Sequence, residues 1–252
     1  MLFLFYTSFG LHRDTGCRKQ DASCILYLVS FFTLSCNMTR KDRYRQVIEY
    51  FLKNAPDAET ELDYEEPYEL LVAVILSAQC TDKRVNMTTP AIFKKFPDIQ
   101  SLSKASFEEL FPLIKSISYP NNKTKHLINM AKKVMDEFDG KIPMTVNELM
   151  LLPGVGRKTA NVVTSVIDQQ PNMPVDTHVF RVAARLGLTK DAKTPLAAEM
   201  QLVKYIPKDL IADAHHWLIL HGRYICVARK PKCNQCGLTG ICKFFHTRVI
   251  EP

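Results

Sequence analysis

A lysine directly behind a glycine-rich turn is the first residue whose position suggests chemistry. The segment Leu151–Ala160 places Gly154, Val155 and Gly156 in a tight turn, and Lys158 in the first turn of the helix expected to follow. Such a turn exposes backbone N–H groups that can bind phosphate. The positive end of the helix disfavours a protonated amine, and a nucleophilic lysine must be neutral. The alternative is an ordinary helix connection with a solvated lysine.

An acidic residue follows 18 positions later, at a second expected helix start. In the segment Pro174–His178, Asp176 precedes a helical pattern, so it is well placed as an N-cap. Capping alone would explain an aspartate here. Its pairing with the lysine at the glycine turn, 18 residues earlier, favours a functional role in addition to capping.

Four of the eight cysteines gather near the C-terminus with the spacing C-x6-C-x2-C-x5-C. A tight cluster in a chain of 252 residues favours metal binding in a reducing compartment over disulfides. Four thiolates within 17 residues suit a tetrahedral metal or an iron–sulfur cluster, and zinc is the simpler expectation from chemistry alone. The four residues are Cys226, Cys233, Cys236 and Cys242.

The charge of the chain permits an anionic partner. The formal net charge is +7, and the stretch from Ala214 to Ile250 contains no Asp or Glu. Arg229, Lys230 and Lys232 lie in this stretch, between the first two clustered cysteines. A segment of one sign is a plausible phosphate-facing surface, although many basic proteins simply carry solvated lysines.

The first 37 residues are unlike the rest of the chain. The apolar run Cys24–Cys36 is too short to cross a bilayer, which takes about 20 residues, but it could form the core of a signal peptide. A helical pattern follows Met38 at once. We therefore interpret Met38 as the natural start and residues 1–37 as a doubtful extension, and we expect no membrane partner.

Helical patterns dominate from Thr39 onward, and no segment alternates like a strand. Apolar residues from Tyr44 to Leu52 repeat with helical spacing, Pro67 suits a first helical position, and Ser106 with Glu109 forms a capping box. Gly140 can end the helix before it. The sequence therefore predicts an all-α fold of about ten helices, which could form two lobes around a cleft.

The segments LPGVGRKTANVV and VDTHVFRVAARL together resemble the endonuclease III family of helix–hairpin–helix DNA glycosylases. The resemblance runs from about Thr39 to the C-terminus. It implies two helical lobes with the active site between them, a hairpin that grips the damaged strand, and a damaged pyrimidine flipped into the cleft. Lys158 would attack C1′ of the sugar and form a Schiff base, and β-elimination would cut on the 3′ side. Asp176 would activate the nucleophile and stabilise the positive sugar.

The cysteine spacing resembles the [4Fe–4S] motif of the same family, which implies that Cys226, Cys233, Cys236 and Cys242 hold this cluster. The loop with Arg229, Lys230 and Lys232 is similar to a basic loop that contacts DNA phosphates. The resemblance places a central lobe at about residues 66–180, with the hairpin at 151–160. The second lobe would combine residues 38–65 with 181–252, including the iron–sulfur loop 226–242.

The segment Leu76–Asp82 matches a family segment near the cleft. By analogy Gln79 would fill the gap left by the flipped base, and Ser77 and Asp82, with His178, would line the pocket. Each of these residues could equally be a polar residue at a helix end.

One departure from the family pattern concerns the opposite strand. Where the family often carries Gly-Leu or a similar pair before Tyr, this chain has Ser118-Tyr119-Pro120. Tyr119 could stack between bases as a wedge, which leaves the opposite-base preference open.

The sequence thus predicts a bifunctional base-excision-repair DNA glycosylase and AP lyase for oxidised or damaged pyrimidines. The alternatives are a monofunctional glycosylase for another base and a non-catalytic iron–sulfur DNA-binding protein. Lys158 argues against the first, because a related adenine-removing branch lacks it, and Lys158 with Asp176 argues against the second. We expect a monomer that binds double-stranded DNA with damaged bases or abasic sites. Its expected location is cytoplasmic, of bacterial type and nucleoid-associated.

Overall fold

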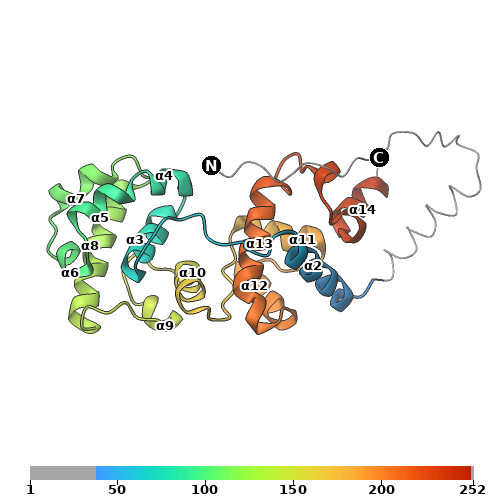
Figure 1. Cartoon of the computed structure of the whole chain (residues 1–252), viewed down its shortest axis with the longest axis horizontal. Coiled ribbons are helices and arrows are strands. Elements are labelled where there is room, and N and C mark those ends of the chain that lie inside the picture. Colours follow the sequence, from blue (N-terminus) through green and yellow to red (C-terminus); the bar gives the residue numbers. More distant parts are fainter. Residues whose placement is uncertain (1–37, 251–252) are drawn as a thin grey trace, which may run out of the picture. The chain divides into compact units, whose positions relative to one another are not determined.

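The structure is a computed structural model that describes residues 38–250, so the interpretation of residues 1–37 lies outside the described part (Figure 1). The predicted fold class is confirmed, since the described residues form thirteen α-helices, three 3₁₀ helices and no strand. The count exceeds the expected ten because α4, α6 and α9 span only 5, 5 and 4 residues, too few for an apolar stripe. No described helix is long and apolar enough to cross a membrane. The α-helices are α2 (Arg40–Asn54), α3 (Pro67–Ser77), α4 (Asp82–Asn86), α5 (Thr89–Lys95), α6 (Ile99–Ser103), α7 (Phe107–Ile114), α8 (Pro120–Glu137), α9 (Val146–Leu149), α10 (Arg157–Asp168), α11 (Thr177–Leu186), α12 (Pro195–Tyr205), α13 (Ile211–Tyr224) and α14 (Lys243–Ile250); the 3₁₀ helices are η1 (Lys208–Leu210), η2 (Cys233–Gln235) and η3 (Thr239–Ile241).

The first lobe surrounds α3, whose residues from Leu70 to Leu76 are all buried. Pro67 occupies the first helical position, as predicted, and α3 packs against α8 and α10. The capping box of Ser106 and Glu109 is present at the start of α7. Gly140 has φ +73 and its N–H bonds to the Val134 carbonyl, so α8 ends where the sequence predicts. This lobe holds both the hairpin and the end of α3 in fixed positions.

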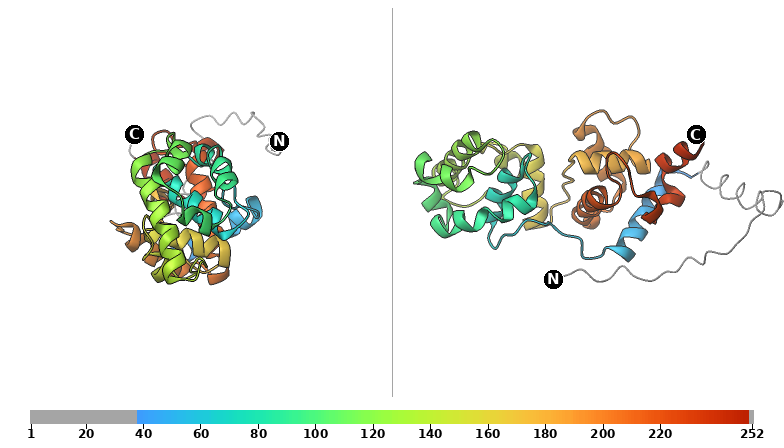
Figure 2. Two further views of the ribbon diagram at one scale, coloured as in Figure 1. Left: turned by 90° about the vertical axis from the view of Figure 1, so that its left-hand side faces the viewer. Right: turned by 90° about the horizontal axis from the view of Figure 1, so that it is seen from above.

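The second lobe brings the two ends of the described chain together, because α2 packs with the helices that follow residue 173 (Figure 2). The Phe51 ring stacks on Trp217 at 5.7 Å, and the Trp217 indole donates to the Ala55 carbonyl at 2.8 Å. Helix α11 packs along α13 so closely that a Cβ on Gly222 would lie 2.9 Å from Cβ of His178. These contacts fix α11 and α13, which carry several candidate site residues.

The buried apolar residues divide between two cores. Leu62 belongs to the core of the first lobe. Met173, Val175 and Val179 are buried in the core of the second lobe. Helix α10 ends before them, where Gln169 takes a left-handed conformation with φ 46. The lobe boundaries at about residues 66 and 180 stay predictions.

Candidate active site and iron–sulfur loop

The hairpin before α10 is shaped mainly by one of its two glycines. Gly154 has φ +82, and a Cβ there would lie 2.9 Å from Cβ of His126, so the turn requires glycine. Buried Val155 anchors the turn, and its N–H donates to the Leu152 carbonyl at 3.1 Å. Gly156 has φ −94, and a Cβ there would meet no atom within 4 Å. Space beside Gly156 therefore leaves the start of α10 open to a close approach by an anion.

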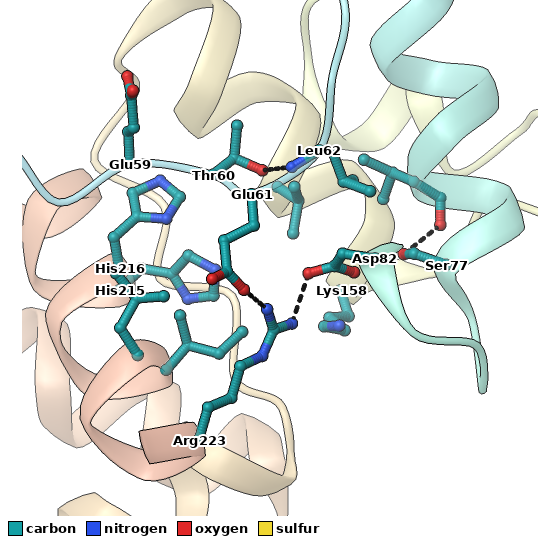
Figure 3. Close-up of a pocket in the computed structure, with 14 residues that line it drawn as sticks. Glu59, Thr60, Glu61, Leu62, Ser77, Asp82, Lys158, His215, His216 and Arg223 are labelled. Carbon is teal, nitrogen blue, oxygen red and sulfur yellow. Dashed lines mark hydrogen bonds and ion pairs between the residues drawn. The ribbon is translucent and has the colours of Figure 1, made fainter. Parts of the chain in front are cut away.

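Lys158 lies in the first turn of α10, is exposed, and lines a pocket (Figure 3). The walls of this pocket come from α3, α4, α10, α13 and the segment before Leu62. Ser77 and Asp82 are among the lining residues, whereas His178, Gln79 and Tyr119 are not. The structure thus brings together Lys158 and two of the three predicted pocket residues.

A half-buried arginine organises the charged wall of this pocket. Arg223 on α13 pairs with Asp82 at 2.6 Å and with Glu61, as the dashed lines in Figure 3 show. The Tyr224 hydroxyl donates to Glu61 at 2.5 Å. Burial lowers the pKa of Arg223, but Asp82 and Glu61 outweigh this and raise it. The wall therefore presents a charged guanidinium and two carboxylates, and nothing in the sequence spacing predicted the part played by Arg223.

Asp176 is the N-cap of α11, as predicted. Its Oδ1 accepts hydrogen bonds from the backbone N–H groups of His178 and Val179, both at 2.8 Å. Both bonds end on Oδ1, and no hydrogen bond to the other carboxylate oxygen is found among the described residues. No ion pair joins Asp176 to Lys158 in the part of the chain that the structure describes. The His178 ring instead contacts Arg181, with Nδ1 and Nη2 3.2 Å apart.

A buried histidine connects the surroundings of Lys158 and Asp176. His215 on α13 is only 3% exposed and lines the pocket. Its ring lies beside the backbone of Pro174, two residues before Asp176, and its Nδ1 has no hydrogen-bond partner among the described residues. Burial lowers the pKa of His215 well below its ordinary value, and the charges of His216 and Lys158 act in the same direction. This histidine is therefore neutral, and sequence reasoning missed it because a histidine in an apolar helix gives no distinctive signal.

The four clustered cysteines line one pocket, together with Leu186, Pro231 and Phe244. Burial of the Cys236 thiol is the main cause that raises its pKa to about 11. The charges of the other three cysteines raise this pKa further, so the four thiols act on one another. His221 Nε2 lies 3.6 Å from Cys236 Sγ. No group of three or more His, Cys, Asp or Glu side chains among the described residues is arranged to hold a single ion. Four thiols spread around one apolar pocket fit a cluster of several iron atoms.

The basic loop between Cys226 and Cys233 is held by a helix distant in sequence. Arg185 on α11 donates to the carbonyls of Val227 at 2.8 Å and Ala228 at 2.7 Å, and its guanidinium stacks over Phe244. Sequence reasoning missed this contact, which joins residues more than 40 positions apart. Three basic residues in the loop are exposed: Arg229, Lys230 and Lys232.

Comparison with known protein families defines the class of this fold and site. Residues 72–208 match the HhH-GPD superfamily of base excision DNA repair proteins. Residues 226–242, which begin and end at clustered cysteines, match the iron–sulfur binding domain of endonuclease III. The two matches together cover the hairpin, α11 and the cysteine pocket.

Individual relatives show which family within this superfamily the chain resembles. The chain is 43% identical over 206 residues to endonuclease III of Rickettsia felis, a match that covers 82% of this chain and 96% of that protein. It is 45% identical over 200 residues to endonuclease III of Rickettsia conorii, covering 79% and 95%. A solved structure of a trapped endonuclease III–DNA covalent intermediate, an estranged-adenine complex, matches with a TM-score of 0.80 at 41% identity, covering 84% of this chain and all of that one.

The chain belongs to the endonuclease III family. It is accordingly a base-excision-repair DNA glycosylase with AP lyase activity, and it carries the family's iron–sulfur domain.

Proposed function

We propose that Lys158 is the nucleophile of this enzyme and Asp176 its acidic partner. The observation that carries this assignment is that Lys158 lines the pocket while the space beside Gly156 leaves the first turn of α10, whose backbone N–H groups have no intrahelical partner, open to an anion. A phosphate on those groups would place the adjoining sugar near the amine. The Lys158 amine attacks C1′ and the damaged base leaves with the bonding electrons. The amine then forms a Schiff base with the opened sugar, and β-elimination breaks the strand on the 3′ side.

Asp176 serves this sequence of steps through its free oxygen. Two backbone N–H groups hold Oδ1, which fixes the direction of the carboxylate. The other oxygen takes the proton that the attacking amine loses, and the negative charge stabilises the positive sugar. Neutral His215 adds no competing positive charge beside the amine, because its pKa lies well below the ordinary value.

The proposed substrate class is an oxidised or otherwise damaged pyrimidine flipped from double-stranded DNA. The pocket offers carboxylate acceptors and a guanidinium donor on one wall, through Asp82, Glu61 and Arg223, with Ser77 nearby. Pyrimidines carry carbonyl oxygens and N–H groups that can pair with both kinds of group. By analogy with the family, Gln79 fills the space of the extruded nucleotide and Tyr119 acts as the wedge in the opposite strand.

The cysteine pocket and the basic loop complete the proposal. Cys226, Cys233, Cys236 and Cys242 hold the [4Fe–4S] cluster, whose iron–thiolate bonds supply a structural staple. The ordered loop then presents Arg229, Lys230 and Lys232 to DNA phosphates. We further propose that the protein acts as a monomer in the cytoplasm of a bacterial-type cell, associated with the nucleoid.

Borohydride trapping on a duplex with one abasic site tests the assignment. Wild-type protein should give a covalent adduct, Lys158→Ala none, and Asp176→Asn a strongly slowed yield, since the free carboxylate oxygen is lost. Lys141→Ala, an exposed lysine in the same lobe, is the matched control. Wild-type protein that binds the duplex without forming an adduct would refute the lyase and favour a monofunctional glycosylase or a simple DNA binder.

A further inference from the structure

Two exposed residues outside the pocket share an unusual backbone conformation. Gln79, just after α3, has φ 55, and Tyr119, just before α8, has φ 56. Neither is a glycine, and the left-handed region costs other residues about 1–2 kcal/mol. Tyr119 is 63% exposed, so burial of its side chain does not offset this cost. Strain of this kind persists only where the surrounding structure imposes it, and it gathers at functional sites.

Two side chains impose it by joining the loops. The Ser118 hydroxyl donates to the Gln79 carbonyl at 2.7 Å. The Lys123 ammonium crosses from α8 to the end of α3, where it donates to the carbonyls of Leu76 at 2.8 Å and Ala78 at 2.6 Å. The Lys123 backbone N–H also donates to the Tyr119 carbonyl at 3.1 Å. Lys123 therefore contacts both the end of α3, next to Gln79, and Tyr119 itself.

Burying the ammonium of Lys123 to join two loops costs free energy, because the charge loses its hydration. It is only 6% exposed, and no carboxylate pairs with it among the described residues. Its charge rests on carbonyls at the negative end of α3, which attracts cations. Burial lowers the pKa of Lys123. Since an apolar side chain would fill a buried position with less desolvation, the ammonium is better explained by what it holds in place.

We propose that Ser118 and Lys123 are positioning residues that hold Gln79 and Tyr119 as one rigid, two-residue probe of double-stranded DNA. The inference rests on the proposed function, in which both residues enter the duplex at the lesion. A probe whose strained backbone is already fixed loses little conformational freedom on insertion. Base extrusion and opposite-strand stacking are then coupled, because Gln79 and Tyr119 cannot shift independently.

Single-turnover borohydride trapping on two substrates tests the coupling. One is an abasic duplex and the other is the same abasic strand without its complement, which presents no opposite base to unstack. Ser118→Ala should lower the ratio of duplex to single-strand rate about threefold to tenfold, the effect of one lost hydrogen bond. Lys123→Met should lower it further. Ser116→Ala, an exposed serine two residues earlier, should leave the ratio unchanged.

A double variant shows whether Ser118 acts through Gln79. In a Gln79→Ala background, Ser118→Ala should cause a smaller loss than in the wild-type background, because one of the two side chains that Ser118 positions is already missing. Fully additive losses, or equal slowing on both substrates, would overturn the proposal. This comparison stands even if Lys123→Met does not fold.

A fluorescence measurement of base unstacking tests the coupled probe without depending on the assignment of Lys158 as the nucleophile. A 2-aminopurine placed opposite the abasic site should brighten when wild-type protein unstacks it, and brighten less with Ser118→Ala. Absence of any wild-type adduct would refute the catalytic assignment while leaving this readout intact. Equal brightening by wild type and Ser118→Ala would refute the coupled probe.

Discussion

The hairpin before Lys158 and the loop between Cys226 and Cys233 are both proposed to contact phosphates, yet they are held in different ways. The hairpin is shaped within its own lobe, by the bond from Val155 to Leu152 and by the left-handed Gly154, which packs against His126 of α8. The loop depends on distant groups: Arg185 on another helix and the pocket of four thiols. The hairpin should therefore tolerate damage in the second lobe, while the loop should not.

Removing one of the four thiols should cause the largest loss of DNA affinity, because it should disorder the loop while leaving the hairpin intact. In Cys236→Ser the loop loses its staple, and three basic side chains contribute less to binding. At about 1 kcal/mol each, affinity for abasic duplex should fall about 100-fold. Binding titration with an iron assay checks this, and Asn234→Ala, at an exposed residue of η2 between two of the cysteines, is the control. Amide exchange in α10 should remain slow, and equal loss of protection there would contradict the contrast.

Acid should weaken the lobe that holds the loop, because α13 carries buried histidines. Burial lowers the pKa of His216 to about 4. The unfolded chain, with a pKa near 6.5, therefore takes up a proton that the folded state does not. This stability is complete above pH 6.5 and is lost as the pH falls toward 4, by about 2 kcal/mol at pH 5. Urea unfolding at pH 7.5 and pH 5 should show a smaller difference for His216→Gln. An unchanged difference would exclude His216 as a source of acid sensitivity.

Substitutions at the two glycines of the hairpin should affect different properties, stability at Gly154 and DNA binding at Gly156. Gly154→Ala forces a left-handed alanine against His126 and should lower the free energy of unfolding by about 1–2 kcal/mol. Gly156→Ala meets no neighbouring atom, so it should scarcely change stability but should weaken DNA binding by covering the open N–H groups. Urea unfolding and binding titrations distinguish them. The same pattern in both variants would show that the hairpin is not organised as described.

Arg185→Met should loosen the loop without removing its charges. Losing two hydrogen bonds to the loop carbonyls should weaken binding to abasic duplex about fivefold, a free-energy change of about 1 kcal/mol. Arg45→Met, which removes an exposed arginine paired with Asp42, is the matched control. If both variants bind alike, Arg185 does not support the loop.

The same contrast explains what the sequence could predict. Local patterns gave the N-cap at Asp176, the first residue of α3 and the left-handed Gly140, because each depends on neighbours within a few residues. The environment of the pocket was not predictable, since Arg223 meets Asp82 across 141 positions only when the chain is folded. Contacts of this kind join side chains that no spacing rule relates, and His215, Arg185 and Lys123 were missed for the same reason.

Identification of the trapped residue tests the central claim most directly. Wild-type protein, trapped by borohydride on an abasic duplex, is digested and the crosslinked peptide is sequenced by mass spectrometry. The sugar fragment should be found on Lys158, in the peptide that follows the glycine turn. A fragment on any other lysine, or on the terminal amine, would contradict the assignment of the nucleophile and of the pocket it lines.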